Sequence, residues 1–540
     1  MKNFLIVALV IVTGGAAAEN SQTTAEQSFV LVNQQNSWYE SAAKHIQQQR
    51  SIANSIQNEE GAAKNIILFI GDGMNLTTVT ASRILEGQQQ GMLGEENNLS
   101  FDEFPFSGLA KTYAVDSQVA DSANTMTAII SGVKTNIGIL GLDETVTRSD
   151  CSSQKANAVI SALDLAEIAG LSTGIVTTTR VTHATPAATY AKSPDRDWED
   201  PSEMPQQAIE DGCVDIASQL IGYQSNINTR YPGANSNGIE VVMGGGGRHF
   251  LPEISANVEF KASQGQRPDG RNLITEWKAL YPKGLFMDSR ADFDSADFDG
   301  VKKVFGLFNK THLRFDTNRK SKMIKEPSLS EMTDKALQVL SKNPKGFFLM
   351  VEAGRIDHAH HVGNAFNALS DTIELSQAVE MALNKTSAKD TLIIVTADHG
   401  HVFTMAGYPK RGNPILGKVV SPGESKPQLA GDNLPYTTLG YANGLGHRHL
   451  GSVTDADKGY KYKAAAGRAD LTEVDTTQSG FFQESLVPLE SETHSGEDVP
   501  IYATGPGAHL ISGSNEQTII FHAINHAGGL LSKAKRALRH

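Results

Sequence analysis

The sequence predicts an α/β fold, a three-layer sandwich in which helices cover both faces of a central, largely parallel sheet. Short, almost purely apolar runs such as Asn65–Ile70 alternate with longer helical stretches, and this alternation is typical of strands buried on both faces. Polar residues follow the apolar runs directly, and ligands of such sheets bind beyond the carboxyl ends of the strands. With 540 residues, 39% of them apolar, the chain is large enough for a substantial core and an inserted second domain.

The first residues predict export. Lys2, an apolar run from Phe4 to Val12 and the small residues Ala16–Ala18 form a signal-peptide pattern with a cleavage site after Ala18. That run is too short to span a bilayer, which takes about 20 residues, and no apolar tail follows Lys533–His540. We therefore expect a periplasmic or secreted protein without a membrane anchor. The net charge of −13 also argues against nucleic acid or an anionic membrane as the main partner.

The elements are expected in the following order. After a polar arm with a helix around Ser41–Ile56, the apolar runs predict strands at Asn65–Ile70, Ile175–Val176, Glu240–Met243, Phe347–Val351, Leu392–Thr396 and Ile501–Ala503. The helices expected between and after them are Asn157–Ala169, Ser330–Ser341, Asn367–Leu383 and Thr518–Leu538. The glycine cluster after Met243 lacks the Gly-Lys-Ser/Thr of a phosphate-binding loop and predicts only a tight turn. Between about Phe403 and Glu490 the alternation of strand and helix patterns gives way to short β-like segments such as Tyr436–Leu439, which indicates an insertion.

Ser122 stands before a run, Ala123–Ile130, that has a helical pattern. Asp and Ser are preferred N-cap residues, so Asp121 and Ser122 by themselves favour a simple helix cap. A serine at a helix N-terminus also lies where free backbone N–H groups and the helix dipole favour a bound anion. The choice between these interpretations depends on the residues that other strands bring alongside.

Histidines and carboxylates gather after several predicted strands. Asp357 and His361 are four residues apart, share one face of a helix and can hold one metal ion. The pair Asp398–His399 follows another strand, and His494 supplies a further imidazole. Together with Asp72 these residues form two zinc-like sets.

Oxygen ligands form a third set. Asp72, Thr185 and Glu352 offer the hard oxygen atoms that suit magnesium. Two metal ions can hold the attacking and leaving oxygens of a phosphoryl transfer, for which Ser122 would be the nucleophile. Arg196 is a candidate for gripping two phosphate oxygens, although most arginines beside aspartates form solvated ion pairs.

In this order the motifs resemble those of the alkaline phosphatases, especially the branch typified by the animal enzymes. The resemblance covers nearly everything from Gly61 to the C-terminal helix. The matching runs are Ile70–Met74, Asp121–Ala123, His183–Pro186, Gly354–His361, Thr396–His399 and Glu492–Asp498.

The resemblance implies hydrolysis of phosphate monoesters at alkaline pH through a phosphoserine on Ser122, with two zinc ions and one magnesium ion. Arg196 matches the phosphate-gripping arginine, and Asp121 matches the carboxylate that positions it. The ligand sets that the resemblance implies are Asp357, His361 and His494 for the first zinc, Asp72, Asp398 and His399 for the second, and Asp72, Thr185 and Glu352 for magnesium. His183 and His358 match positions beside the ligands that tune metal preference.

Cys151 and Cys213 are the only cysteines. In an exported chain they favour a disulfide, although two buried free thiols would also fit the sequence. The resemblance implies the disulfide of the family.

The resemblance also divides the chain into a signal peptide (1–18), an arm (19–62), a catalytic core (63–402 and 491–540) and a crown-like insertion (403–490). Family members are usually homodimers, with the crown at the interface and Tyr408 matching a tyrosine that reaches the partner's site. The chain departs from the animal enzymes at their calcium site, where Asn309 replaces an expected glutamate and Glu326 an aspartate. This departure argues against a fourth metal ion.

Four rival functions are weighed against this one. Phosphodiesterases and cofactor-independent phosphomutases are expected to share the two-metal core, but Arg196 and the magnesium set favour a dianionic monoester. A sulfatase is disfavoured because the segment after Ser122 lacks Cys/Ser-x-Pro-x-Arg. A secreted zinc-binding protein that has lost catalysis would show metal content without turnover. The physiological ester, the compartment of export and the occupant of the third metal site stay undetermined by the sequence.

Overall fold

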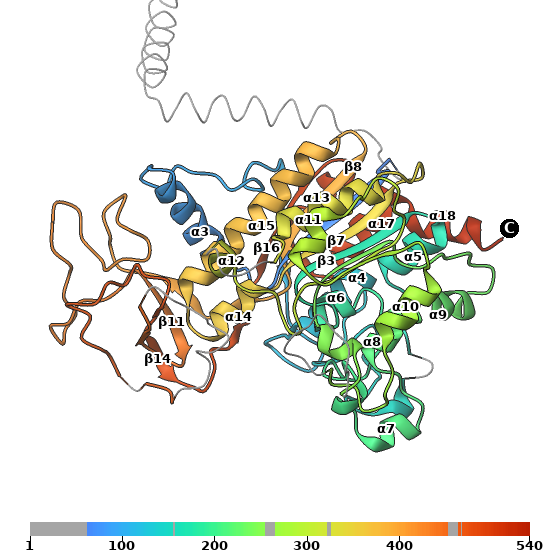
Figure 1. Cartoon of the computed structure of the whole chain (residues 1–540). Coiled ribbons are helices and arrows are strands. Elements are labelled where there is room, and N and C mark those ends of the chain that lie inside the picture. Colours follow the sequence, from blue (N-terminus) through green and yellow to red (C-terminus); the bar gives the residue numbers. More distant parts are fainter. Residues whose placement is uncertain are drawn as a thin grey trace, which may run out of the picture. The chain divides into compact units, whose positions relative to one another are not determined.

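A ten-stranded sheet forms the centre of the structure (Figure 1). Its strands lie in the order β17 (Gly513–Glu516), β2 (Phe106–Lys111), β16 (Val499–Thr504), β8 (Thr391–Ala397), β1 (Asn65–Gly71), β7 (Phe347–Ala353), β3 (Ser172–Arg180), β4 (Val241–Gly245), β6 (Val304–Leu307) and β5 (Leu285–Met287). Only β16 runs antiparallel to its neighbours in this sheet. The predicted α/β class with a largely parallel sheet is confirmed.

This computed structural model describes residues 62–154, 157–253, 265–320, 326–451, 463–465 and 467–539. All of them belong to one unit, Glu59–His540. The predicted signal peptide and the helix expected at Ser41–Ile56 lie outside the described residues. Of the helices that are described, none combines the length and the apolar character needed to cross a membrane.

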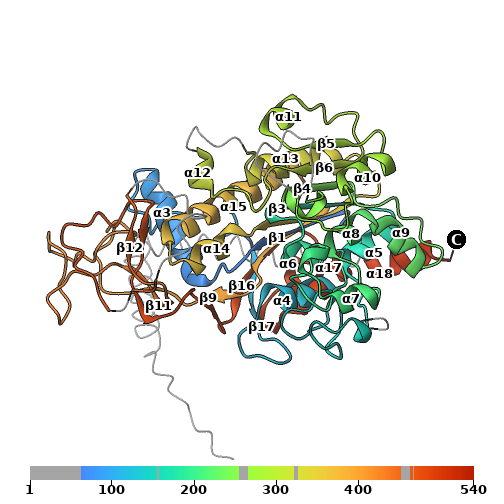
Figure 2. The same ribbon diagram turned by 60° about the horizontal axis from the view of Figure 1, so that its bottom comes forward.

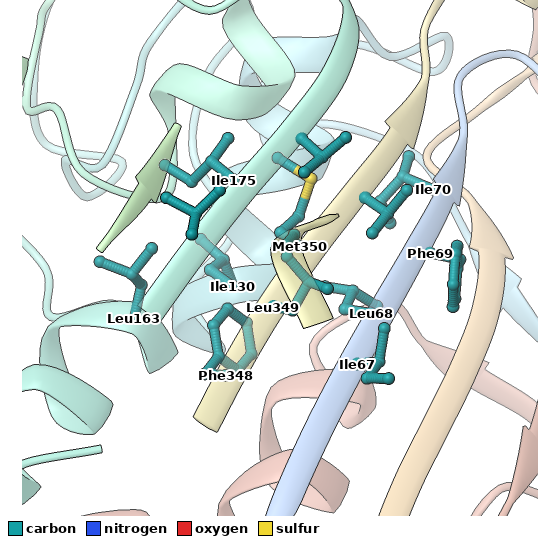
Figure 3. Close-up of a cluster of buried hydrophobic side chains, with 14 of the residues drawn as sticks. Ile67, Leu68, Phe69, Ile70, Ile130, Leu163, Ile175, Phe348, Leu349 and Met350 are labelled. Carbon is teal, nitrogen blue, oxygen red and sulfur yellow. The ribbon is translucent and has the colours of Figure 1, made fainter. Parts of the chain in front are cut away.

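The core lies on both sides of the central strands. In β1, β7 and β8 every residue except Asn65 is buried, as their continuous apolar sequence predicts. Figure 3 shows Ile67–Ile70 of β1 beside Phe348–Met350 of β7, with Ile130 and Leu163 from helices packed against the sheet. Each fully buried side chain of this kind stabilises the fold by roughly 1.5–3 kcal/mol, so the strand positions are strongly fixed.

Helices cover both faces of the sheet. Figure 2 shows α13 (Leu329–Leu340) and α15 (Ala365–Lys385) on one face, and α4 (Ser122–Ser131), α5 (Ala162–Ala169) and α17 (Ile519–Gly528) on the other. The remaining α-helices are α3 (Leu76–Gln89), α6 (Ala184–Ala187), α7 (Gln206–Glu210), α8 (Ile216–Ile221), α9 (Tyr223–Arg230), α10 (Leu273–Leu280), α11 (Arg290–Ser295), α12 (Asp316–Lys320), α14 (Arg355–His361) and α18 (Leu530–Ala537).

Small sheets form outside the central one. Strands β10 (Phe403–Met405), β11 (Leu439–Gly444) and β14 (Ser485–Pro488) form a three-stranded sheet, and β12 (Arg448–His449) pairs with β13 (Phe481–Phe482). Strand β9 (Gly400–His401) continues from the end of β8 and pairs with β15 (His494–Ser495). This pairing brings His494 next to the carboxyl edge of the central sheet.

Several predicted elements have different bounds, and three of these differences have a clear local cause. The helix expected over Asn157–Ala169 begins at Ala162, because Ser161 and Asp164 form a capping box at that point. The C-terminal helix is broken into α17 and α18 at Gly529, whose φ of 58° is left-handed. The strand expected at Tyr436–Leu439 starts only at Leu439, since Tyr436 and Thr438 instead make backbone hydrogen bonds with the 417–419 segment.

Two further expectations are confirmed. The glycine cluster after Met243 forms a tight turn, with Gly246 at a φ of 97°. Cys151 and Cys213 form a disulfide with their Cα atoms 5.8 Å apart.

The core also contains a buried carboxylate, that of Glu167. Glu167 of α5 is 2% exposed and accepts hydrogen bonds from the hydroxyls of Thr173 and Ser236. Nearby, the Lys303 ammonium lies 3.0 Å from Glu240. Burial, with a further contribution from the Glu240 charge, raises the pKa of Glu167 to about 8. The folded state therefore holds a proton on Glu167 that the unfolded chain releases near its ordinary pKa of 4.5.

We expect Glu167→Gln to remove a pH-dependent loss of stability. Between pH 4.5 and 8 the folded wild type binds more protons here than the unfolded chain, so its free energy of unfolding falls as pH rises through this window. The amide does not titrate, so urea denaturation should show the variant gaining at least roughly 1 kcal/mol over wild type between pH 5 and pH 9. The exposed Glu144→Gln is the control, and a constant difference between variant and wild type at both pH values would contradict the argument.

Candidate active site

The first candidate metal group combines α14 with β15. Asp357 and His361 lie one turn apart on α14, as their spacing predicts, and β15 adds His494. The Oδ1 atom of Asp357 lies 3.2 Å from His361 Nε2 and 3.3 Å from His494 Nε2, and these two nitrogens are 3.1 Å apart. All three residues predicted for the first zinc therefore converge.

The backbone fixes which ring nitrogen carries the proton in both histidines. His361 Nδ1 lies 2.7 Å from the Glu492 carbonyl oxygen, and His494 Nδ1 lies 2.8 Å from that of Ala120. A carbonyl oxygen only accepts, so each Nδ1 donates and, in the neutral ring that binds a metal ion, each Nε2 presents a lone pair. Two lone pairs and a carboxylate oxygen that point at one another describe a cation site rather than a hydrogen-bonded cluster.

His401 of β9 belongs to the first candidate metal group, although the site prediction did not include it. Its side chain is fully buried, with Nδ1 2.6 Å from Glu492 and Nε2 2.9 Å from Asp357. Burial acts to lower the pKa of His401, but Glu492 and Asp357 raise it to about 10. An imidazolium that donates to both carboxylates orients Asp357 toward the two histidines. The spacing of His401 two residues after His399 was a signal, but its partner Glu492 is distant in sequence.

The second group lies at the ends of β1 and β8. Gly71 and Ala397 are paired in register, so Asp72 and Asp398 follow at the same level of the sheet. The Nε2 atom of His399 lies 3.4 Å from Asp72 and 3.3 Å from Asp398. The predicted second set thus comes together, and the His399 ring stacks on His494 at 3.6 Å between centroids, which places it beside the first group.

Ser122 lies at this second group. It is the first residue of α4, is 2% exposed and has its Oγ 3.1 Å from His399 Nε2. Asp121 is the N-cap, accepting from the backbone N–H of Asn124 in a capping box. The cap interpretation is confirmed for Asp121, and the Ser122 hydroxyl points toward the histidine.

The third group contains the predicted magnesium ligands. Asp72, Glu352 and His183 each place a ligand atom within 4.8 Å of the others, and Thr185 of α6 is fully buried. Both carboxylate oxygens of Asp72, Oε1 of Glu352 and the Thr185 hydroxyl are buried without a hydrogen-bond partner among the described residues. Such oxygens are costly unless a cation satisfies them, so this donor set fits a magnesium-like ion.

The carboxylates of this region repel one another. Burial, followed by the charges of Asp398 and Asp357, raises the pKa of Asp72, and burial raises that of Glu352 to about 7 against the lowering effect of hydrogen bonds from Thr177 and Thr179. A bound cation would reverse both shifts.

The Arg196 side chain points toward Asp121, the N-cap residue of the helix that begins at Ser122. One guanidinium nitrogen donates to Asp121 Oδ2 at 3.0 Å and the other lies 3.2 Å from His183 Nε2. Burial acts to lower the pKa of Arg196, but Asp121 and Asp197 raise it. His183 has its pKa lowered to about 3 by burial and by Arg196, so it stays neutral and accepts from the guanidinium.

Three histidines pack beside the third group. His183 and His358, both expected there, have ring centroids 5.6 Å apart, and His312 lies 4.2 Å from His358 and 5.6 Å from His183. Sequence reasoning missed His312 because its motif, Lys310–Leu313, matches no ligand spacing. Arg355 approaches His358 Nδ1 at 3.0 Å, so this face of the site combines imidazoles with arginine.

In two other clusters of possible metal ligands, a carboxylate accepts hydrogen bonds from protein groups. Glu326 accepts from the Asn309 amide at 2.6 Å and from the Arg314 backbone N–H at 2.7 Å, which occupies both oxygens at the expected calcium position. Glu199 lies with Glu203 and His249 in a metal-like geometry, but it already accepts from both Arg180 and Thr182. Protein groups therefore donate to both the Glu326 and the Glu199 carboxylates.

The chain is similar to known proteins over most of its length. A family profile described as alkaline phosphatase matches residues 63–530. The chain belongs to the alkaline phosphatase family. The resemblance found in the motifs is thereby confirmed, and the phosphatase is an enzyme of the class that hydrolyses phosphate monoesters and depends on metal ions.

Relatives match over almost the whole phosphatase. The tissue-nonspecific alkaline phosphatase of Felis catus is 42% identical over 490 residues, covering 89% of this chain and 87% of the cat protein. That of Homo sapiens is 43% identical over 472 residues, covering 86% and 83%. The crystal structure of Thermus thermophilus alkaline phosphatase has a TM-score of 0.59 at 22% identity, covering 90% and 98%, and it supports the fold.

Proposed function

We propose that this phosphatase hydrolyses phosphate monoesters at alkaline pH through a phosphoserine on Ser122, in a site for two zinc ions and one magnesium ion. One observation carries the proposal. The Nε2 lone pairs of His361 and His494 converge on Asp357 within 3.3 Å while their Nδ1 atoms donate to backbone carbonyls. The His494 ring of this group stacks on His399, whose Nε2 lies 3.1 Å from the hydroxyl of the helix-terminal Ser122.

The proposed ligand sets are those that the resemblance to the family implies. Asp357, His361 and His494 would hold the first zinc, Asp72, Asp398 and His399 the second, and Asp72, Thr185 and Glu352 the magnesium ion. When bound, such ions lower the pKa of a nearby hydroxyl and offset the charge of the transferring phosphoryl group.

The chain's own residues supply positioning. The N-terminus of α4 presents Ser122 where backbone N–H groups favour the phosphate anion, and Arg196 grips two phosphate oxygens while Asp121 holds the guanidinium in place. Ser122 Oγ forms a bond to phosphorus as the bond to the alcohol breaks. Water then cleaves the phosphoserine, returning the serine hydroxyl and releasing inorganic phosphate.

The first test compares kcat/KM for a phosphomonoester with that for its matched diester, at alkaline pH, on enzyme loaded with zinc and magnesium. A strong monoester preference is expected, because a diester has only two free phosphate oxygens to share between Arg196 and the metal ions, whereas a monoester has three. Arg196→Ala should lower kcat/KM for the monoester by about 100-fold and the diester rate much less. A preference for the diester would indicate a phosphodiesterase, and bound metal without turnover would indicate a zinc-binding protein.

The nucleophile is tested by trapping. Ser122→Ala should form no phosphoenzyme with a radiolabelled monoester after an acid quench, and its kcat should fall at least roughly 1000-fold. Ser117→Ala, in the loop before α4, is the control and should still be labelled. A phosphorylated intermediate in Ser122→Ala would reject the assignment.

We also propose that residues 403–490 form a crown-like insertion through which two chains associate. Tyr408 is 85% exposed and Leu486 83%, and Val487 and Leu489 are also exposed, all on or next to the β10–β11–β14 sheet. Monomeric proteins rarely leave such apolar groups uncovered together. Export through the segment 1–18 stays a prediction.

Sedimentation velocity tests the dimer. Wild type should sediment with twice the mass of the chain at micromolar concentration, and Leu486→Glu should weaken association by placing a charge in the interface. The exposed Leu280→Glu, on α10, is the matched control. A monomeric mass for wild type would contradict the proposal.

A further inference from the structure

A second arginine holds the loop that carries Arg196. We propose that Arg148 is a positioning residue for the phosphate-binding guanidinium, acting through Gly138 and through the carboxylates on either side of Arg196. The inference rests on the proposed role of Arg196 and concerns a residue without a place in the reaction itself.

Arg148 forms ion pairs with both sequence neighbours of Arg196, Asp195 and Asp197. Its Nε and one terminal nitrogen lie 3.3 Å and 3.2 Å from the two carboxylate oxygens of Asp195, and the same terminal nitrogen lies 3.2 Å from Asp197. Asp195 is 6% exposed, and it also accepts from the Ser149 hydroxyl. A bidentate pair with one nearly buried partner is better ordered than an ordinary surface ion pair.

Gly138 connects Arg148 to the site. Its N–H donates to Asp121 Oδ2 at 3.1 Å, the same oxygen that accepts from Arg196 at 3.0 Å, and its carbonyl accepts from the Arg196 backbone N–H at 2.8 Å. The φ of 78° at Gly138 is left-handed. A Cβ there would lie 2.5 Å from Arg148 Nε and 2.6 Å from Cζ, so the Arg148 guanidinium covers the glycine directly.

Electrostatics gives Arg148 a second effect. Arg196 stands between two aspartates, and a carboxylate released by Arg148 would compete with phosphate for the Arg196 guanidinium. Asp197 already contributes to the raised pKa of Arg196, which shows that its charge reaches that group. By pairing with Asp195 and Asp197, Arg148 keeps the inner guanidinium available to the substrate.

The loop has other ties that would preserve its path without Arg148. Leu140 and Ser193 exchange two backbone hydrogen bonds of 2.9 Å, and the Ser149 N–H donates to the Pro194 carbonyl at 3.0 Å. The Cys151–Cys213 disulfide lies two residues beyond Ser149. Since the Arg148 side chain is 42% exposed, its removal should leave the fold intact and change the position of Arg196.

The test uses Arg148→Met on the metal-loaded enzyme, with inorganic phosphate as the probe. We expect the inhibition constant for phosphate and KM for a monoester to rise by roughly 10-fold, with a smaller change in kcat. Arg148→Lys should recover only part of the loss, because an ammonium cannot bind Asp195 in a bidentate manner. Arg271→Met is the matched control, since Arg271 is also 42% exposed and paired with a carboxylate, and it should change neither constant.

A double mutant separates positioning from a general structural effect. In the Arg196→Ala background, Arg148→Met should cause almost no further change in phosphate affinity, because its effect passes through Arg196. Additive losses, an unchanged phosphate constant in Arg148→Met, or a matching loss in Arg271→Met would each overturn the inference. If Arg196→Ala itself left phosphate affinity unchanged, the proposed role of Arg196 would fail instead.

Discussion

Carboxylates buried at the ends of adjacent parallel strands are the constraint on which this structure depends. Asp72, Glu352 and Asp398 are fully buried at the carboxyl ends of β1, β7 and β8. Burial raises the pKa of each of them, and several of their oxygens find no donor among the described residues. The sheet therefore places negative charge where water cannot solvate it, at a cost that bound cations would offset.

The strands that bury these carboxylates also fix the positions of the candidate ligand atoms. Parallel registry sets Asp72 level with Asp398, and β9 pairs with β15 to bring His494 to the same edge. Backbone carbonyls then fix the tautomers of His361 and His494. Because these supports are strands and backbone groups rather than long side chains, the ligand atoms lose little conformational entropy when a cation binds.

The sequence predicted the parts of the fold and site that depend on local patterns. Continuous apolar runs identified β1, β7 and β8, and helical periodicity placed Asp357 next to His361. Strands β2 and β17, at one side of the sheet, were missed because Phe106–Lys111 and Gly513–Glu516 mix polar residues and glycine without clear alternation. His401 and His312 were missed for a different reason: their roles come from long-range contacts with Glu492 and His358, and no local spacing encodes such contacts.

Arg196 differs from the metal ligands in how it is held. The ligands follow strands or lie on helices, whereas Arg196 lies in a loop between α6 and α7, which an isolated β-bridge between Ser193 and Leu140 ties to the rest of the chain. Its position depends on polar contacts with Asp121 and Gly138 and on the disulfide-linked segment behind them. Packing in the core positions the candidate metal ligands. Arg196 is positioned by ion pairs near the surface, and such pairs weaken as the salt concentration rises. Ionic strength should therefore affect phosphate binding more than it affects the fold.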